Sequence, residues 1–425
     1  MLKEDPRYKT YVRILKEELL PAMGCTEPIA IAYCAAIAGK TLGVLPERVL
    51  VEASGNMIKN VKSVVVPNTD GLRGIEAAAA AGLVAGNPDR LLEVIAEVSP
   101  AQKEAIQEYL SRKCIQVRPK ADGEILDIVV HGWAGGHEAQ VRIAGKHTNV
   151  VLIRLDDRVL REGSPKIGRT GGQADRELLN IADILDFAET ADLADVRKTL
   201  DRQISCNMAI SQEGLTHDWG ANIGKVLLRS YPDDIRIRAR AAAAAGSDAR
   251  MSGCELPVVI NSGSGNQGIT ASVPVVTYAR YLGVGEEKTY RALLVSNLVT
   301  IHLKTGIGRL SAYCGAVSAG CGAGCGIAYL QGGDLRCISH TLVNALAIDS
   351  GIVCDGAKAS CAAKIASAVD AGILGYEMFC QGQQFRGGDG LLSKGVENTI
   401  RNISRLGSVG MRETDTEIIQ IMTQC

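Results

Sequence analysis

The chain has 425 residues, enough to bury a large core, and its 46 basic and 47 acidic residues give a net charge of −1. Such a balance provides no basic face, so we exclude nucleic acid and anionic membrane surfaces as partners. Aromatic residues make up only 4% of the chain, so we expect an aliphatic core.

The N-terminal segment is charged throughout and lacks the apolar stretch of a signal peptide. Residues 310–333 contain no charged residue, which is long enough to raise the question of a membrane span. Their seven glycines make the segment too small and flexible for a lipid-facing helix, so we expect it to be buried in protein. We therefore predict a soluble cytoplasmic protein, in which thiols stay reduced.

The first part of the chain predicts alternating helices and strands. Residues 7–44 predict two helices with a break at Pro21, and Thr26 can cap the second helix. Residues 48–71 contain β-branched runs punctuated by glycine, asparagine and proline, which predict strands. Residues 74–86 and 90–98 then predict helices.

The pattern changes at residue 115. Residues 115–160 alternate with a period of two and contain glycine turns, which predicts an antiparallel meander. A polar, glycine-rich linker follows from Arg161 to about Ala174. Alanine-rich helices are predicted at 176–191, 192–213, 218–230, 233–249, 268–283, 286–300, 338–349 and 359–372. Glycine-rich stretches separate them at 261–268, 304–326, 351–356 and 382–390.

These elements predict an α+β fold with two lobes. Residues 1–165 are expected to form a small α/β lobe with N-terminal helices and an antiparallel sheet. Residues 175–425 are expected to form a larger all-helical lobe, which carries the cysteine-rich segments and the predicted site.

Cys25 lies just ahead of the helix predicted from Thr26. The partial positive charge at a helix start lowers a thiol pKa, which suits a nucleophile, a base or a metal ligand. A small buried thiol is the alternative, and we expect that state for Cys34. Local chemistry does not decide between the two.

Residues 261–268, with the sequence NSGSGNQG, lie just before a predicted helix. The backbone N–H groups and the side chains of Ser262, Ser264 and Asn266 form a candidate anion nest, suited to a carboxylate or a phosphate. The segment matches neither a P-loop nor a dinucleotide fingerprint. A simple glycine-rich connection is the alternative.

Four further polar residues are candidates for substrate binding. Asn56 and Lys59 lie in a polar segment that could hold the charged ends of a small substrate. His302 and Lys304 could place charge in the same cleft as the nest. Each has a plainer alternative, because surface turns look much the same and lone residues of these kinds are more often structural or solvated.

The clustered cysteines of the C-terminal half carry the strongest chemical signal. They are Cys314, Cys321, Cys325, Cys354 and Cys361. Histidine is scarce and no CxxC pair occurs, which argues against zinc. Cysteine-rich loops without histidine fit an iron–sulfur cluster, in which three thiolates leave one iron open as a Lewis acid. Free thiols packed among glycines are the alternative.

Four segments together resemble the L-cysteine desulfidase family, which is related to the α region of iron–sulfur L-serine dehydratases. The segments are GCTEPIAIAYCAA, NSGSGNQG, AYCGAVSAGCGAGCG and CDGAKASC, and the resemblance covers nearly the whole chain. It implies a [4Fe–4S] cluster held by three cysteines. It also implies conversion of L-cysteine and water to pyruvate, ammonia and hydrogen sulfide without pyridoxal phosphate.

Site residues follow from this resemblance. Cys354 and Cys361 resemble the paired cluster ligands, although their spacing here is shorter, and Cys314 resembles the third ligand. Cys321 and Cys325 remain alternatives to Cys314. The resemblance implies that Cys25 is the base, and the nest would hold the substrate carboxylate.

Three alternative functions stay open. Serine dehydration differs only in the leaving group, and one sequence cannot rank it against cysteine desulfuration. A non-catalytic iron–sulfur sensor or binding protein is disfavoured because no basic DNA-binding segment or effector module is visible. A plain helical protein with incidental thiols is the third. Homo-oligomerisation is left open.

Overall fold

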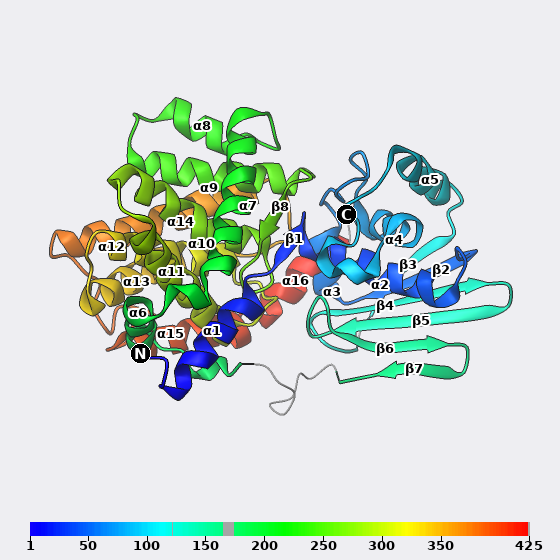
Figure 1. The fold of residues 1–425 in the computed structure, drawn as a ribbon, viewed down its shortest axis with the longest axis horizontal. Helices are drawn as coiled ribbons and strands as arrows, with labels where there is room; N and C mark the ends of the chain where they lie inside the picture. The colour runs from blue at the N-terminus through cyan, green and yellow to red at the C-terminus, as the bar shows by residue number, and fades with distance from the viewer. Residues whose placement is uncertain (121, 165–173, 424–425) are drawn as a thin grey trace.

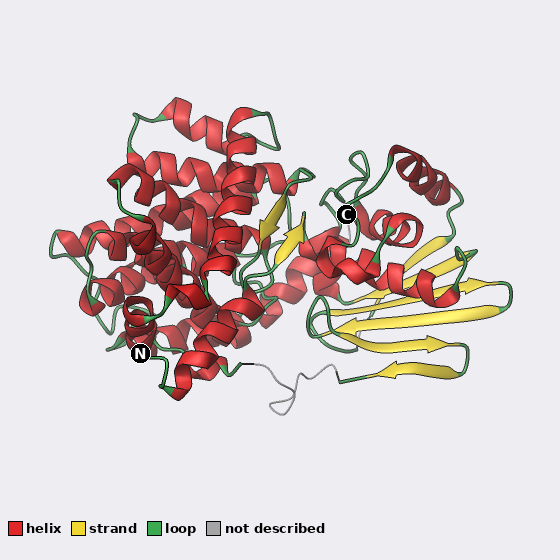
Figure 2. Ribbon diagram, in the orientation of Figure 1, coloured by secondary structure: helices red, strands yellow, loops and turns green. Residues whose placement is uncertain are grey.

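The computed structural model describes residues 1–120, 122–164 and 174–423 and has an α+β architecture (Figure 1). A sheet with helices on one side forms a smaller region, and a larger region consists almost entirely of helices (Figure 2). The predicted fold class is confirmed. The predicted linker and lobe boundary fall largely on residues outside the described ranges, so the division into two domains stays a prediction.

The smaller region is built on a six-stranded sheet with the order β3-β2-β4-β5-β6-β7. Its strands are β2 (Arg48–Ala53), β3 (Ile115–Pro119), β4 (Asp127–Ala134), β5 (His137–Ala144), β6 (Val150–Leu155) and β7 (Arg158–Glu162). Strands β4 to β7 form the predicted antiparallel meander. The prediction was wrong for β3, which pairs in parallel with β2 on the other side of the sheet.

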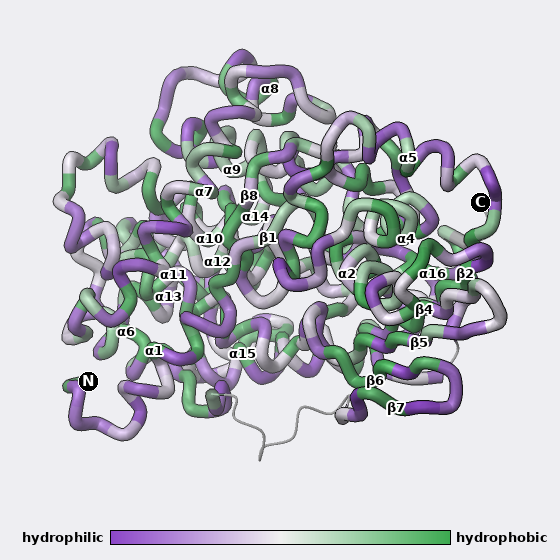
Figure 3. The backbone as a smooth tube through the Cα atoms, turned by 45° about the vertical axis from the view of Figure 1, so that its right-hand side comes forward, coloured by the Kyte–Doolittle hydropathy of each residue, from purple (hydrophilic) through white to green (hydrophobic). Residues whose placement is uncertain are grey.

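Helices α2 (Thr26–Leu42) and α4 (Gly74–Ala85) belong to this region, and α2 packs on the sheet. The two helices approach closely, because a Cβ added at Gly82 would lie 2.1 Å from the Ala32 carbonyl oxygen. In Figure 3 the hydrophobic stretches gather around α4 and the neighbouring strands. These apolar surfaces form the core of the smaller region.

Two predictions in this region were wrong. After β2 the chain forms helix α3 (Gly55–Val61) rather than a further strand. Helical spacing puts Asn56, Lys59 and Asn60 on one face, which a strand could not do. Residues 90–98 contain only a short 3-10 helix, Pro88–Glu93, and helix α5 (Pro100–Ser111) lies beyond the predicted elements.

The larger region holds most of the remaining helices. They are α1 (Pro6–Glu18), α6 (Ile181–Thr190), α7 (Arg197–Thr216), α8 (Ile223–Ser230), α9 (Ile235–Met251), α10 (Gly265–Leu282), α11 (Glu286–Ile307), α12 (Gly315–Leu330), α13 (Leu335–Asp349), α14 (Cys361–Cys380), α15 (Val396–Arg405) and α16 (Arg412–Thr423). A small antiparallel pair joins β1 (Pro21–Met23) to β8 (Pro257–Val259). The helices predicted between residues 176 and 372 are present with shifted ends.

Helix α12 occupies part of the stretch 304–326, which was predicted to be a glycine-rich separator, so that prediction was wrong. Glycine lowers helix propensity, but here it permits close packing against α14. A Cβ added at Gly324 would lie 2.5 Å from the Gly372 carbonyl oxygen. As expected, the uncharged segment is largely buried in protein. No helix in the described ranges is long and apolar enough to cross a membrane.

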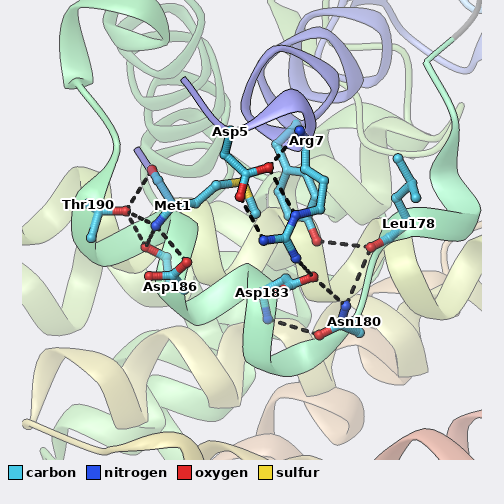
Figure 4. Close-up of polar contacts among 9 residues, drawn as sticks. Met1, Asp5, Arg7, Leu178, Asn180, Asp183, Asp186 and Thr190 are labelled. Atoms are coloured by element: carbon cyan, nitrogen blue, oxygen red, sulfur yellow. Dashed lines mark hydrogen bonds and ion pairs between the residues drawn. The ribbon is translucent and has the colours of Figure 1, made fainter. Parts of the chain in front are cut away.

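The N-terminal helix packs against the larger region, and the C-terminal helix packs against the smaller one. Helix α1 packs in the helical core, whereas the sequence grouped it with the sheet. Figure 4 shows this docking, in which the Met1 ammonium lies 2.6 Å from Asp186 and the Arg7 guanidinium lies 2.6 Å from Asp183. In the opposite direction, α16 packs beside α3 (Figure 1).

Candidate active site

One cavity contains most of the residues that the sequence singled out. Its lining includes Cys25, Asn56, Lys59, Ser264, Asn266, Lys304, Cys314, Cys354 and Cys361. These residues come from segments that lie more than 300 positions apart in the chain. Helices α2, α10, α12 and α14 all begin at this cavity.

Backbone pairing brings the cysteine segments together. Cys314 is the N-cap of α12, and its backbone N–H donates to the Ile352 carbonyl at 3.1 Å. The Cys354 N–H in turn donates to the Ala312 carbonyl at 2.6 Å. Cys361 is the first residue of α14. The three sulfur positions are therefore fixed by main-chain contacts and by two helix starts.

Cys321 and Cys325 do not share this position. Both are buried inside α12 and belong to the helical core, and neither is among the residues that line the cavity. The Cys325 thiol donates to the Ile338 carbonyl at 3.8 Å, away from the other cysteines. Of the three cysteines between residues 314 and 325, the geometry favours Cys314 as a ligand.

Helix starts and cationic side chains line the cavity together with the carboxylate of Glu27, and three of these cations are paired with carboxylates. Cys25, Ser264 and Cys314 are N-caps of α2, α10 and α12, and none of these helix starts has a side-chain cap hydrogen bond. Helix N-termini carry partial positive charge and unpaired N–H groups. The cationic side chains in the lining are Lys59, Arg250, Lys304, Arg309 and Lys364. Such a site suits an anionic ligand.

Three cysteine thiols line the cavity, and thiolates are the usual ligands of iron–sulfur clusters. Within the described ranges, no group of three His, Cys, Asp or Glu side chains is arranged to hold a single metal ion. Burial, followed by the charge of Cys354, raises the pKa of Cys314 to about 12. Cluster binding must therefore displace thiol protons.

Cys25 differs from the expected activated thiolate. Burial, followed by the charge of Glu27, raises its pKa well above the ordinary value, so the expected lowering by the helix start was wrong. The thiol donates a hydrogen bond to Glu27 Oε2 at 3.2 Å. The desolvation of a nearly enclosed thiol outweighs the helix dipole here.

Glu27 accepts the hydrogen bond of Cys25, and it was not predicted from the sequence as a site residue. Burial opposes its ionisation, but His147, followed by Cys25 and Arg250, lowers the pKa of the Glu27 carboxyl to about 2. The His147 ring lies 3.8 Å away in the turn between β5 and β6. The spacing Cys-x-Glu at a helix start was the available signal for Glu27, whereas nothing local marks His147.

Asn56 and Lys59 line the cavity, but their polar groups are held by the C-terminal helix. Lys59 Nζ lies 2.5 Å from Asp415 Oδ1 and donates to the Cys354 carbonyl at 3.3 Å. Asn56 Nδ2 donates to Asp415 Oδ2 at 2.7 Å. This geometry favours a structural role over the predicted substrate contact.

Two other predicted residues lie outside the lining of this cavity. Ser262 donates to Asn261 Oδ1 at 2.8 Å and faces a neighbouring cavity. His302 Nε2 lies 2.8 Å from Glu397 Oε2 and joins α11 to α15. Lys304 lines both cavities, and its burial lowers the pKa of the ammonium to about 8.

Comparison with known proteins places these features in a family. Residues 89–420 match the serine dehydratase alpha chain family. The chain belongs to this family. The matched region therefore includes Cys314, Cys354 and Cys361, whereas Cys25 and Glu27 precede it. The family name describes a lyase-type enzyme.

Full-length relatives of this serine dehydratase alpha chain member are UPF0597 proteins, a name that assigns no activity. One from Desulfitobacterium hafniense is 59% identical over 100% of this chain and 99% of its own. Others come from Lachnoclostridium phytofermentans (49% identical, 98% and 99% covered) and Treponema denticola (45% identical, 99% and 99% covered). The similarity thus includes the segment before residue 89.

Proposed function

We propose that the protein is an iron–sulfur L-cysteine desulfidase that converts L-cysteine to pyruvate, ammonia and hydrogen sulfide. The observation that carries the proposal is the shared cavity of Cys25 with Cys314, Cys354 and Cys361. Membership in the serine dehydratase alpha chain family supports elimination at the β-carbon of an amino acid. The free state of all twelve described cysteines suits a cytoplasmic enzyme.

Cys314, Cys354 and Cys361 would hold a [4Fe–4S] cluster. When bound, the cluster supplies an open Lewis-acidic iron that stabilises charge on the leaving group. The protein contributes the positive helix starts and the cationic lining, which favour both an anionic cluster and the carboxylate of a substrate.

Cys25 is the proposed base. It enters the reaction as a thiol that Glu27 Oε2 holds by a hydrogen bond at 3.2 Å, so it must first lose its proton. Glu27, with a pKa of about 2, is too weak a base to keep that proton, which therefore passes to solvent. The resulting thiolate takes the α-proton of cysteine. The electrons of the C–H bond form the Cα=Cβ bond, the Cβ–S bond breaks, and HS⁻ leaves. Water then hydrolyses the released aminoacrylate to pyruvate and ammonia.

The test is anaerobic purification and cluster reconstitution, with iron and acid-labile sulfide analysis and a sulfide-release assay on L-cysteine. Cys25→Ala should keep its iron and lose about 100-fold or more in turnover. Normal turnover by this variant with a full cluster would remove the base assignment. Cys354→Ser should lose iron and colour, and an unchanged spectrum would refute the cluster.

L-serine dehydration is a second candidate, because the matching family is named for serine dehydratases. The residues for proton removal would be the same, and only the leaving group would be hydroxide. Rates of pyruvate formation from L-serine and L-cysteine, measured on one reconstituted sample, decide between the two. A higher kcat/KM for serine would replace the desulfidase proposal.

A further inference from the structure

Arg250 is a buried cation that forms no ion pair with a carboxylate among the residues that the structure describes. It lies at the end of α9, is 2% exposed, and is the largest of the fully buried side chains. Its Nη1 donates to Asn266 Oδ1 at 3.0 Å, but Nε and Nη2 have no partner among the described residues. A buried guanidinium is costly unless its N–H groups are paired. Arg250 Nε and Nη2 are therefore available to donate hydrogen bonds to a ligand.

These donors lie beside the N-terminus of helix α10. A Cβ added at Gly265, the first residue of α10, would lie 2.3 Å from Arg250 Nε. Both Arg250 and the N-cap Ser264 line the cavity. Because Asn266 turns Oδ1 toward Arg250, its Nδ2 is the end left to donate to a ligand. A guanidinium beside a helix N-terminus is suited to binding the two oxygens of a carboxylate.

Gln267 provides a second buried polar group without a partner, and it has the opposite polarity. It is 5% exposed, lines the same cavity, and its Oε1 accepts no hydrogen bond from any described residue. A Cβ added at Gly315 would lie 2.7 Å from its Nε2, so the amide packs against Gly315, the residue that follows Cys314. An unpaired acceptor at this position suits an ammonium group.

We propose that Arg250 binds the α-carboxylate of the substrate and that Gln267 accepts from its α-ammonium. The ligand is then a free α-amino acid, and thiols that lack either charged group bind weakly. The inference rests on the proposed function for the reaction itself, but it concerns binding and can be tested separately. It assigns Arg250, which sequence reasoning did not select, to substrate recognition.

Three thiol probes separate the two contacts: L-cysteine, cysteamine (no carboxylate) and 3-mercaptopropionate (no ammonium). The affinities of all three are measured on the cluster-loaded full chain by thermal shift, and those of cysteamine and 3-mercaptopropionate also by inhibition of L-cysteine turnover. Arg250→Met should weaken L-cysteine and 3-mercaptopropionate about tenfold or more and leave cysteamine within about twofold. Gln267→Leu should weaken L-cysteine and cysteamine but spare 3-mercaptopropionate. Arg250→Lys should give an intermediate loss, because lysine keeps the charge without the planar fork.

Arg240→Met is the matched control, since Arg240 lies on the same helix, pairs with Asp370 at 3.1 Å, and is not among the cavity-lining residues. It should leave all three affinities unchanged. Equal weakening of every probe by Arg250→Met, or no weakening, would overturn the inference even if sulfide is released. Probe binding that follows the expected pattern in a protein that releases no sulfide would instead overturn the proposed function alone.

Discussion

At the residue scale, the Cys25 thiol and the Glu27 carboxyl influence each other's pKa. The thiol is enclosed and faces an ionised carboxylate, so it keeps its proton in spite of its place at the start of α2. Glu27 stays ionised because His147, followed by Cys25 and Arg250, lowers the pKa of its carboxyl. Burial of the Cys25 thiol, followed by the charge of Glu27, therefore outweighs the lowering effect of the helix dipole on the Cys25 pKa.

Glu27→Gln should make Cys25 reactive at lower pH. Burial is the largest cause of the raised Cys25 pKa and Glu27 is the second, so removing the carboxylate charge lowers that pKa and thiolate forms earlier as pH rises. The measurement is the pH profile of iodoacetamide labelling of Cys25 in cluster-free protein, followed by peptide mass spectrometry. Cys206 is the internal control, because its pKa is raised chiefly by burial and Glu27 is not among the causes. A Cys25 profile that stays in place would contradict the coupling.

At the element scale, the close approach of α12 and α14 positions two of the three predicted cluster ligands. Gly320 and Gly324 face the backbone of α14, and Gly372 faces α12 in return. Because Cys314 and Cys361 stand at the first turns of these two helices, the interhelix distance sets the separation of their sulfur atoms. Glycine in the middle of α12 is thus a packing requirement.

Gly324→Ala should push the two helices apart. The added methyl would lie 2.5 Å from the Gly372 carbonyl oxygen, and overpacking of this kind costs about 1–3 kcal/mol in the free energy of unfolding. We also expect reduced iron content after reconstitution. Urea denaturation and iron analysis provide the measurements. Gly285→Ala is the control, because no atom lies within 4 Å of the added methyl; equal losses in both variants would refute the packing argument.

Sequence reasoning located elements where local signals agree with tertiary packing and failed where packing decides. The meander from β4 to β7 lies within the segment predicted for it, and the alanine-rich helices lie where they were predicted, with shifted ends. Helix α12 was missed because its glycines oppose helix formation locally and are favoured only by the presence of α14. Strand β3 was misplaced because three α-helices, α3, α4 and α5, separate it in sequence from its partner β2, and no short sequence pattern records such a pairing.

At the scale of the whole molecule, the C-terminal helix ties the two regions together at the cavity. Asp415 on α16 accepts from Asn56 and Lys59 on α3, and Lys59 also contacts the Cys354 carbonyl. Cys25, Cys314, Cys354 and Cys361 could be selected from the sequence because cysteine is chemically distinctive. Arg250 and Asp415 could not, since their roles depend on which distant residue they face.

Asp415→Asn should destabilise the protein by about 3 kcal/mol, because it leaves the Lys59 ammonium, whose side chain is 1% exposed, without its counter-charge. Urea denaturation measures the free energy of unfolding, and hydrogen exchange should show faster opening of α16. The matched control is Asp89→Asn, which breaks an exposed pair with Lys40 and should cost no more than about 0.5 kcal/mol. Similar losses in the two variants would argue against the tie.

The cavity is lined by residues from both before and within the region that matches the family, which begins at residue 89. This limits which part of the gene could transfer the proposed activity to another protein. Residues 89–420 include the three cysteines. Cys25 and Glu27 precede residue 89, as does strand β1, which pairs with β8. A gene fragment limited to the matched region would specify the proposed metal ligands without Cys25, the proposed base. Transfer of the proposed activity would therefore need the residues before 89 as well as the matched region. If the two parts were made as separate polypeptides, they would have to associate through the pairing of β1 with β8.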